Sequence, residues 1–479
     1  MTGQVFIGGA WRAPSSGSTI PVIDPATGET FTEIADGQAA DIDAAVHAAR
    51  RALNGAWGTT TALERGRALT RLSQKVLDNF EELTGLESRD CGKTLAVAGN
   101  DIRMLARYFE FYGGAADKVH GETIPYLHNH VVSIVRQPYG VSGHIIPWNY
   151  PTQILGRSVG AALAMGNASV IKPSEDACLS ILRLAELTVE AGFPDGAFNV
   201  VPGYGATAGA ALIAHPDVNF VSFTGSPEVG TLVQQETARH HVKCVLELGG
   251  KSPQIVFSDA RLERAIPAIV NGIVQNAGQT CSAGSRLLVQ REIYDEVVER
   301  VADRFRSLRT GPQSMDPDCG PVINQKQYQR IRSFIEDAVG SGARIAGQGA
   351  LAPDLPPGGF YIPPTLFADL PRDHELAQRE IFGPVLAAMP FSDEADAIAL
   401  ANDTEYGLVA GIWTENGGRQ QRLARAIDSG QVFINCYGAG GGVELPFGGF
   451  GRSGHGREKG FVALEEMSIS KTIVQNIEA

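Results

Sequence analysis

The segment VNFVSFTGSPEVG, residues 218–230, decides the fold class. Alternating side chains in its first half predict a strand, which runs into the turn Thr224-Gly225. Ser226 then suits a helix N-cap, Pro227 the first helical position and Glu228 the first turn. A strand, a glycine turn and a helix N-terminus together present backbone N–H groups to an anion, typically a phosphate. An ordinary strand-to-helix turn is the alternative, because the glycines are spaced GxxxxG and not GxGxxG.

Strand-like and helix-like runs alternate along most of the chain, which predicts an α/β protein with parallel sheets. The expected strands are 141–146, 169–172 and 286–289, the expected helices are 154–165 and 259–276, and the expected tight loop is 278–283. Residues 467–474 predict a further strand without an obvious neighbour. Because an unpaired strand edge invites pairing with another chain, a second subunit is a natural partner.

The composition narrows the class of protein. The 479 residues suggest two to four domains, and 43% hydrophobic residues exclude a wholly disordered chain. A net charge of −13 disfavours nucleic acid or an anionic membrane as the main partner. The start of the chain lacks the pattern of a signal peptide, and no apolar stretch reaches the length of a membrane helix. We therefore expect a soluble, cytoplasmic protein whose six cysteines, with no CxxC pair, are reduced thiols.

No metal site is predicted. His128 and His130, and the pair His240-His241, lack partners at ligand spacing and are expected in exposed loops or at a helix end. The glycines at 438 and 440–442 predict a flexible loop, because no strand-to-helix pattern surrounds them.

Cys281 and Glu247 are the candidates for covalent chemistry. Cys281 is the one cysteine set in a loop of small residues, AGQTCSAG, which gives a thiolate the access that a nucleophile needs. Glu247 stands at an apolar strand end before Gly249-Gly250, where partial burial would raise its pKa and suit it to act as a general base. An inert core cysteine and a structural glutamate are the alternatives.

Two turns at expected strand ends supply further candidates. In VIKPSE, residues 170–175, Lys172 and Glu175 could meet one ligand, with the acid suited to ribose hydroxyls. In IIPWNYP, residues 145–151, the Asn149 amide could donate to a developing oxyanion. A solvated turn and a turn-forming asparagine are the respective alternatives.

Seven motifs in a fixed order together resemble the NAD(P)-dependent aldehyde dehydrogenase superfamily, and the match runs from about Phe6 to the end of the sequence. They are PWN at 147–149, KPSE at 172–175, FTGSPEVG at 223–230, LELGGKSP at 246–253, GQTC at 278–281, EIFGPV at 380–385 and PFGGFGRSGHGRE at 446–458. The resemblance implies a Rossmann-like NAD-binding domain (1–115 and 139–250), a catalytic domain (251–450) and a small β oligomerisation element (116–138 and 460–479). It also implies a homodimer or homotetramer.

The resemblance implies oxidation of an aldehyde through a cysteine thiohemiacetal and thioester. Cys281 would be the nucleophile, Asn149 and the Cys281 amide would hold the oxyanion, and Glu247 would activate water. Glu458 matches a further acid of the family that assists proton relay. The implied cofactor contacts are Ile146, Pro147, Trp148, Lys172, Glu175, Gly205, Phe223, Gly225, Ser226, Val229, Leu248, Gln327, Glu380 and Phe382. Glu175 favours NAD, with NADP possible.

The family's substrate tunnel maps to Tyr150, Gln153, Arg157, Thr280, Ser282, Tyr437, Val443 and Phe447. Tyr150 and Phe447 favour an aromatic or otherwise bulky aldehyde. Arg157 occupies a position where semialdehyde dehydrogenases of the family bind a substrate carboxylate, so a semialdehyde is the alternative. Arg157 could equally pair with a nearby acid and serve only structure. A cysteine-dependent ester hydrolase is the alternative from another class.

Overall fold

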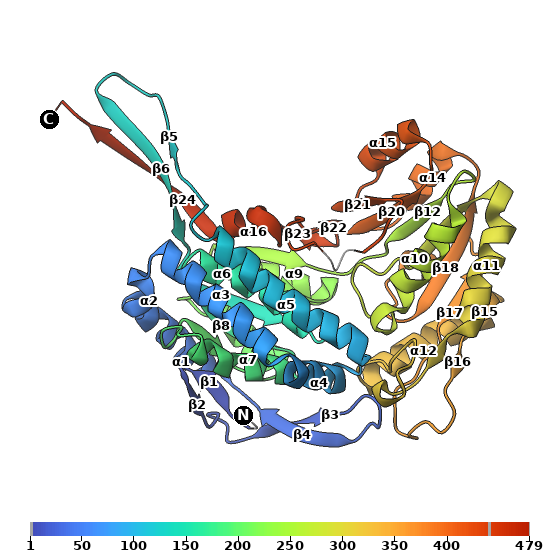
Figure 1. Ribbon diagram of the computed structural model, residues 1–479, viewed down its shortest axis with the longest axis horizontal. Coiled ribbons are helices and arrows are strands. Elements are labelled where there is room, and N and C mark those ends of the chain that lie inside the picture. Colours follow the sequence, from blue (N-terminus) through green and yellow to red (C-terminus); the bar gives the residue numbers. More distant parts are fainter. Residues whose placement is uncertain (1–2, 439–441, 479) are drawn as a thin grey trace.

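The computed structural model describes residues 3–438 and 442–478, and its body holds two large sheets with helices packed around them (Figure 1). The first sheet has the order β2-β1-β9-β8-β7-β10-β11-β23, and its central strands β9 to β11 run parallel. Its strands are β1 Val5–Ile7, β2 Ala10–Arg12, β7 Val141–Ile146, β8 Ala168–Pro173, β9 Phe198–Val200, β10 Phe220–Thr224, β11 Lys243–Glu247 and β23 Gly454–His455.

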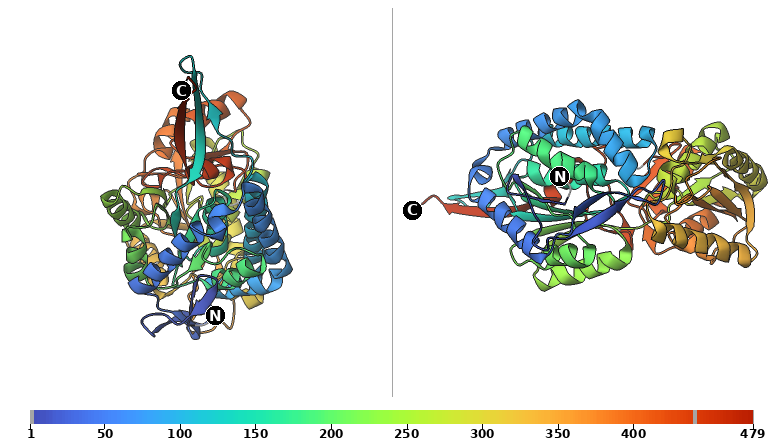
Figure 2. Two further views of the ribbon diagram at one scale, coloured as in Figure 1. Left: turned by 90° about the vertical axis from the view of Figure 1, so that its left-hand side faces the viewer. Right: turned by 90° about the horizontal axis from the view of Figure 1, so that it is seen from below.

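Helices cover both faces of this sheet (Figure 2). On one face α6 and α7 pack against an outer layer of α3, α4 and α5, and on the other lie α1, α8 and α9. The bounds are α1 Ala39–Leu53, α2 Ala56–Thr59, α3 Ala62–Asp78, α4 Phe80–Cys91, α5 Leu95–Ala115, α6 Pro151–Ala164, α7 Leu179–Glu190, α8 Ala210–Ala214 and α9 Pro227–Arg239. Every residue of α6 is buried, because α6 lies between the sheet and α5.

The second sheet has the order β15-β17-β18-β13-β12-β20-β21 and its own hydrophobic core. Its strands are β12 Pro253–Val256, β13 Arg286–Gln290, β15 Arg344–Gln348, β17 Thr365–Ala368, β18 Val385–Phe391, β20 Val409–Trp413 and β21 Gln431–Ile434. The helices of this half are α10 Leu262–Val274, α11 Tyr294–Ser307, α12 Gln325–Gly340, α13 Glu375–Gln378, α14 Glu394–Ala401 and α15 Gly417–Ala426, and α16 Gly460–Glu466 returns to pack on α6.

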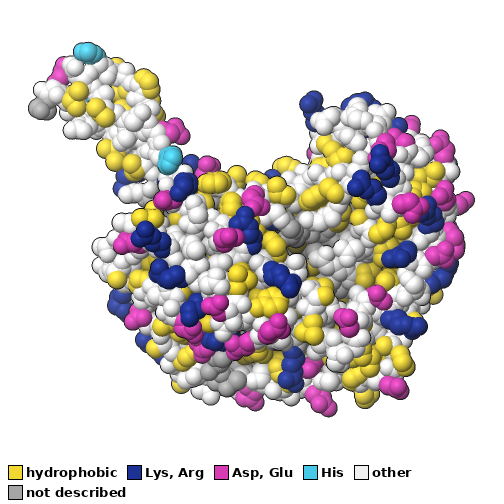
Figure 3. Space-filling view, in the orientation of Figure 1, with side chains coloured by type: hydrophobic (Ala, Val, Ile, Leu, Met, Phe, Trp, Pro, Cys, Tyr) yellow, Lys and Arg dark blue, Asp and Glu magenta, His cyan; other side chains and the backbone are white. Residues whose placement is uncertain are grey.

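A three-stranded antiparallel sheet, which we call the arm, stands out from the body (Figure 3). It consists of β5 Glu122–Thr123, β6 His130–Pro138 and β24 Ser468–Asn476, with β6 in the middle. Large apolar side chains are exposed along it, including Leu127, Val131, Ile473 and Val474. The small sheets elsewhere pair β3 Thr19–Ile23 with β4 Thr30–Ala35, β14 Arg309–Thr310 with β16 Ala350–Leu351, and β19 Tyr406–Gly407 with β22 Phe450–Gly451.

The predicted α/β class with parallel strands is confirmed, and so are the strands at 141–146, 169–172 and 286–289 to within two residues. The helix expected at 154–165 begins earlier, because Pro151 takes the first helical position. His128 lies in the exposed arm loop and His240 and His241 follow α9, as expected, but His130 is the first residue of strand β6 and is half-buried, so the loop prediction is wrong for it. The glycine loop prediction at 440–442 falls mainly outside the described residues. Among the described residues, no helix is long and apolar enough to cross a membrane.

The helix expected at 259–276 is wrong at its C-terminal end. Helix α10 stops at Val274, and a tight turn follows in which Asn276, Ala277 and Gly278 have φ values of 51°, 55° and 71°. Three consecutive left-handed residues cannot continue a right-handed helix. The turn is held in place by the Asn276 side chain, whose Nδ2 donates to the carbonyl of Asn149 at 3.0 Å.

Candidate active site

The candidate site lies where neighbouring parallel strands of the first sheet end. In the register of β10 and β11, Thr224 pairs with Glu247, and Phe223 pairs with Ile145 of β7. The segments that follow these strands therefore reach the same edge, where ligands bind in open α/β sheets. A cavity of about 610 Å³ opens there towards the second sheet, and its walls include Asn149, Glu247 and Cys281.

Cys281 enters the cavity from the loop that follows α10. The left-handed turn at 276–278 redirects the chain, and the Ala283 amide donates to the Thr280 carbonyl at 2.9 Å to close the loop around the cysteine. The Cys281 side chain is only partly buried, whereas Cys91, Cys178, Cys244 and Cys319 are buried in the interior. Burial still raises the pKa of the Cys281 thiol to about 12, and the positive charge of Arg157 opposes this shift.

Glu247 ends β11 with its side chain 1% exposed. Neither carboxylate oxygen has a hydrogen-bond partner among the described residues. Burial raises the pKa of Glu247 well above its ordinary value, and the nearby charge of Glu458 raises it further, while Arg157 acts in the opposite direction. A carboxyl group with a raised pKa is a stronger base once it is ionised, which suits Glu247 to accept a proton.

Asn149 connects the first sheet to the cysteine loop. Its side-chain Nδ2 donates to the Gln279 carbonyl at 3.1 Å, and its own carbonyl accepts from Asn276 Nδ2. The residue is 4% exposed and lines the same cavity as Cys281. An amide held at this place can donate its second N–H to a substrate oxygen.

Glu458 and Arg157 form an ion pair behind Glu247. Glu458 is completely buried and also accepts a hydrogen bond from Ser222 Oγ at 2.9 Å. The Arg157 guanidinium lies 4.9 Å from the centre of the Phe447 ring, and its Nη2 is 3.4 Å from Thr224 Oγ1. The arginine is therefore already bound to protein groups, which corresponds to the structural alternative considered for it.

The two glycines after Glu247 allow the chain to pass through a narrow space. A side chain at Gly249 would collide with the Glu380 carboxylate, and one at Gly250 with the carbonyl of Cys281. The close approach lets the Gly250 amide donate to Glu380 Oε1 at 2.9 Å. Burial raises the pKa of Glu380 to about 7, while the amide of Gly250 and the cation of Lys251 lower it.

The far wall of the cavity is aromatic. Phe382 has a φ of 61°, and its ring meets Trp148 edge-on with the ring centres 5.3 Å apart. The Phe382 carbonyl accepts a hydrogen bond from Gln327 Nε2 at 2.7 Å, which fixes this unusual backbone conformation. Arg330 Nη2 donates to the Glu380 carbonyl at 2.8 Å, so α12 holds both residues of this wall.

The structure brings eight of the fourteen expected cofactor residues to this cavity: Pro147, Trp148, Gly225, Ser226, Leu248, Gln327, Glu380 and Phe382. Ser226 caps α9 as expected, with Val229 N 3.4 Å from its Oγ. The Gly225 amide, in contrast, is not presented to a ligand, because it donates to the Glu247 carbonyl at 3.1 Å. This corrects part of the anion-site prediction.

The remaining expected cofactor residues are not among the residues described as lining this cavity: Ile146, Lys172, Glu175, Gly205, Phe223 and Val229. Ile146 and Phe223 are buried within strands β7 and β10. Lys172 lies near the end of β8, Glu175 follows the strand, and the two side chains pair with each other, with Lys172 Nζ 2.9 Å from Glu175 Oε2. Gly205 and Val229 are exposed.

The expected tunnel residues divide into two groups. Tyr150 Oη lies 2.9 Å from Thr280 Oγ1, and Tyr437 Oη donates to the Ser282 carbonyl at 2.5 Å, so these four residues surround the cysteine loop. Two further expected residues are engaged by the protein itself. Gln153 turns its amide to buried Asp101, and Val443 is 1% exposed within the first core, so neither side chain is free to meet a substrate.

Several residues that line the cavity were not expected from the sequence: Asp176, Asn324, Lys326, Arg330, Arg379, Glu405, Tyr406 and Arg452. Most come from α12 and from loops of the second sheet, which meet the first sheet only in the folded chain. The one local signal was Asn324, whose Oδ1 accepts from Gln327 N at 2.8 Å and caps α12. That signal locates a helix start without revealing what the helix faces.

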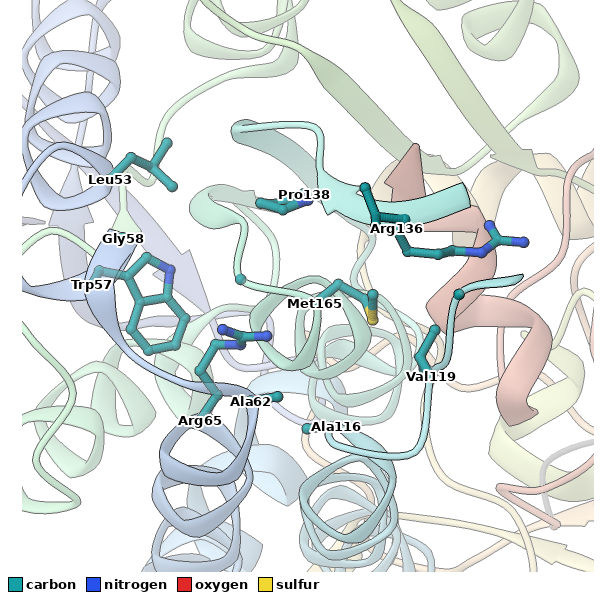
Figure 4. A pocket seen from close by; sticks show the side chains of 13 residues that line it. Leu53, Trp57, Gly58, Ala62, Arg65, Ala116, Val119, Arg136, Pro138 and Met165 are labelled. Atoms are coloured by element: carbon teal, nitrogen blue, oxygen red, sulfur yellow. The ribbon is translucent and has the colours of Figure 1, made fainter. Parts of the chain in front are cut away.

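A second hollow of about 470 Å³ lies at the base of the arm (Figure 4). Trp57, Arg65 and Met165 contribute to its wall on one side, and Arg136 and Pro138 of β6 on the other. It shares no residue with the first cavity, and its described lining includes no cysteine or carboxylate. The thiol, carboxyl and amide groups of the candidate site are therefore gathered in the first cavity.

The chain matches a family model and is similar to several known proteins. Residues 11–473 match the model of the aldehyde dehydrogenase family. A hydroxyisobutyraldehyde dehydrogenase of Mycolicibacterium austroafricanum is 42% identical over 99% of this chain and 94% of its own length. A crystallised Burkholderia cenocepacia protein superimposes with a TM-score of 0.98 and 60% identity over 99% of both chains. The NAD+ complex of a Bacillus cereus aldehyde dehydrogenase superimposes with a TM-score of 0.97 and 38% sequence identity. The alignment covers 100% of this chain and 97% of the other.

Proposed function

Because the chain belongs to the aldehyde dehydrogenase family, we propose that Cys281 is the nucleophile with which it oxidises an aldehyde to the carboxylic acid. The observation that carries this proposal is the meeting of Cys281, Glu247 and Asn149 around one cavity. A thiol, a carboxyl group and an amide are the three groups that covalent aldehyde oxidation requires.

In the first step, the Cys281 thiol gives its proton to solvent water, the thiolate sulfur bonds to the carbonyl carbon, and the C=O π bond opens so that the carbonyl oxygen becomes an oxyanion. Asn149 Nδ2 donates to that oxyanion, because its amide is fixed against the cysteine loop. The pKa of the Cys281 thiol, about 12, keeps the resting residue protonated. The Arg157 cation, which opposes this shift, favours the thiolate when it forms.

The rest of the cavity fits a nicotinamide dinucleotide. Trp148 and Phe382 offer aromatic surfaces, and Glu380 offers a carboxylate for ribose hydroxyls. Ser226 places the N-terminus of α9 where a pyrophosphate can be bound. The similar Bacillus cereus enzyme was solved with NAD+, which supports the assignment. The chemistry that NAD supplies when bound is acceptance of the hydride, and the chain's residues orient the donor carbon on Cys281 towards it.

We assign NAD, in preference to NADP, on the basis of Glu175. Its carboxylate stands 2.9 Å from Lys172 Nζ at the end of β8, and its side chain is 29% exposed. A carboxylate at this strand end can accept hydrogen bonds from ribose hydroxyls and would repel an added phosphate. The neighbouring lysine reduces this repulsion without removing it, so some activity with NADP is expected.

Glu247 releases the product. As a carboxylate it takes a proton from water, the water oxygen bonds to the thioester carbon, the C–S bond breaks and the Cys281 thiolate re-forms. The buried carboxylate has no hydrogen-bond partner among the described residues, so no hydrogen bond from the protein lowers its basicity. Glu458 acts on this step through its charge, which raises the pKa of Glu247.

The substrate we propose is an aromatic or otherwise bulky aldehyde. Tyr150 and Phe447 supply aromatic surface near the cysteine loop, where Tyr150 contacts Thr280. Arg157 is paired with Glu458, which argues against a semialdehyde whose carboxylate would need that arginine.

We further propose that the arm, with its exposed apolar side chains, joins subunits into a dimer or tetramer. In this division, 1–115 and 139–250 bind NAD, 251–450 carry the catalytic loop, and 116–138 with 460–479 form the contact between subunits.

A spectrophotometric screen tests the proposal. Formation of NADH or NADPH is followed with benzaldehyde, a medium-length alkanal and succinic semialdehyde, for the wild type and for Cys281→Ala. We expect NADH formation with the wild type, the highest kcat/KM with benzaldehyde, and no turnover by Cys281→Ala. Cys436→Ala is the matched control, because this exposed cysteine lies outside the cavity lining and should be replaceable. Oxidation by Cys281→Ala at the wild-type rate would refute the nucleophile, and a strong preference for the semialdehyde would refute the bulky substrate.

A further inference from the structure

Three charged side chains are buried together beside the first turn of α6. Lys93 lies between two acids, with its Nζ 3.1 Å from Glu87 Oε1 and 2.6 Å from Asp101 Oδ2. None of the three side chains is more than 1% exposed. Replacing such buried ion clusters by apolar side chains is often neutral for stability, because desolvation offsets the attraction. Stability alone therefore does not account for charges at this place.

The hydrogen bonds of this cluster hold the start of α6. Asp101 Oδ1 accepts from Gln153 Nε2 at 2.6 Å, and Glu87 Oε1 accepts from Thr152 Oγ1 at 3.2 Å. Both donors lie in the first turn of α6, directly after the segment that carries Asn149. The cluster thus anchors the start of α6, whose N-cap residue is Tyr150.

Lys93 also contacts Tyr150, which leads to the cysteine loop. Its Nζ lies 4.5 Å from the centre of the Tyr150 ring, a cation–π distance. At the other end of the ring, Tyr150 Oη lies 2.9 Å from Thr280 Oγ1 and accepts from Gln275 Nε2 at 2.9 Å. Thr280 directly precedes Cys281. A continuous chain of contacts therefore runs from the buried cluster to the residue beside the nucleophile.

We infer that Lys93 is a positioning residue for aldehyde oxidation: it holds Tyr150, and Tyr150 holds the loop of Cys281. The inference rests on the proposed role of Cys281. The loop needs such support because Asn276 and Ala277, at the turn before it, adopt left-handed conformations that cost free energy and persist only when neighbouring groups hold them. A catalytic group that shifts by about 1 Å can lose about 100-fold in rate, so a support at this distance is sufficient to control kcat.

A double-mutant cycle tests whether Lys93 acts through Tyr150. The variants are Lys93→Met, Tyr150→Leu and the two combined, and kcat and KM for NAD are measured for each. We expect Lys93→Met to lower kcat by about 10- to 100-fold and to leave KM for NAD unchanged. The double variant should be no slower than Tyr150→Leu alone. Losses that multiply would mean that the two residues act independently, and the inference would be wrong.

A second readout follows the cysteine itself. Alkylation of Cys281 by iodoacetamide is timed by mass spectrometry without substrate, and the exposed Cys436 serves as the internal reference in the same sample. We expect Lys93→Met and Tyr150→Leu to change the Cys281 rate by a similar factor and to leave the Cys436 rate unchanged. An unaltered Cys281 rate in a folded Lys93→Met protein would overturn the inference.

Asp101→Asn covers the case in which Lys93→Met does not fold, because it keeps the shape of the side chain and weakens the cluster. Its matched control is Asp90→Asn, since Asp90 is also a buried acid but accepts from Leu179 N at the start of α7 instead of holding α6. Asp101→Asn should lower kcat and Asp90→Asn should not. Equal effects of both would overturn the inference. If Cys281→Ala is inactive while the Lys93 and Asp101 variants turn over normally, only the positioning role fails, whereas activity of Cys281→Ala would remove the proposed function itself.

Discussion

Arg157 and Glu458 are bound to each other inside the protein, 9% and 0% exposed, and neither is among the residues that line the cavity around Cys281. The Phe447 ring covers the guanidinium at 4.9 Å, and Thr224 Oγ1 lies within 3.4 Å of Nη2. A side chain held on three sides in this way serves the fold and the charge balance around Glu247. This pairing supports the proposal of a bulky aldehyde over a semialdehyde, and the variants below test it.

Arg157→Leu should destabilise the protein without changing substrate preference. The substitution leaves Glu458 buried without its cation, which costs about 3–5 kcal/mol for a broken buried pair. We expect a lower Tm and an unchanged ratio of kcat/KM for benzaldehyde over succinic semialdehyde. Combining it with Glu458→Leu should recover much of the Tm, because no buried charge is then left unpaired. A selective loss of semialdehyde turnover in Arg157→Leu would restore the carboxylate-binding role.

Glu247→Gln should separate hydride transfer from hydrolysis. The amide cannot take a proton from water, so thioester hydrolysis should slow by about 10²- to 10⁴-fold while the cysteine still attacks the aldehyde. In stopped-flow absorbance we expect a burst of one NADH per subunit followed by a slow steady state. Absence of the burst, with a slow first turnover, would mean that Glu247 acts before the thioester forms.

In Glu247→Gln, the pH dependence of the steady-state rate should differ from that of the NADH burst. The pKa of Glu247 is raised by burial, and an acid is protonated below its pKa, so the base form and kcat should increase as the pH rises through that raised pKa. Glu247→Gln should lose this increase. Its burst rate should still rise with pH, because the pKa of the Cys281 thiol is raised to about 12 and the thiolate fraction grows throughout the measurable range. A burst rate that falls with rising pH would contradict this account.

Glu175→Ser should widen cofactor use. Removing the carboxylate removes the repulsion of an extra phosphate, and a change of about 1.4 kcal/mol corresponds to about tenfold in kcat/KM for NADP. The value for NAD should fall, since the ribose hydroxyls lose an acceptor. Because the side chain is 29% exposed, the Tm should stay close to that of the wild type. An unchanged NADP rate would show that Glu175 does not determine the preference.

Asp90→Asn should stabilise the protein increasingly at higher pH. Asp90 Oδ2 accepts from Leu179 N at 2.7 Å, its other oxygen has no partner among the described residues, and burial raises its pKa from 3.8 to about 8. Since the folded state binds this proton more tightly than the unfolded state, the free energy of unfolding of the wild type falls as the pH rises across that interval. The asparagine variant lacks this titration. Its Tm advantage should grow by several degrees between pH 5 and pH 8, and a constant difference would contradict the assignment.

Local signals allowed much of the fold to be predicted. Alternation marked β10, and Ser226 with Pro227 marked the start of α9, because caps and prolines act within one turn of the chain. The end of α10 was missed because Asn276 is held left-handed by Asn149, 127 positions away, and no local pattern carries that information.

The site divides in the same way. Residues singled out by the sequence motifs, such as Cys281 and Glu380, do line one cavity. The hydrogen bond from Gln153 to Asp101 could not be predicted, because Asp101 lies on α5, in a stretch without any motif. Arg330 and Arg379 were missed because only the packing of the two sheets brings them to the cavity.

The arm has a consequence for how the chain is made. β6 ends at Pro138, but its partner β24 begins only at Ser468, and the two strands pair along nine residues. During synthesis on the ribosome, one edge of β6 has no partner strand until most of both large sheets has emerged. A nascent chain therefore exposes the unpaired edge of β6 until β24 has emerged, and an exposed strand edge is a site at which neighbouring chains can pair.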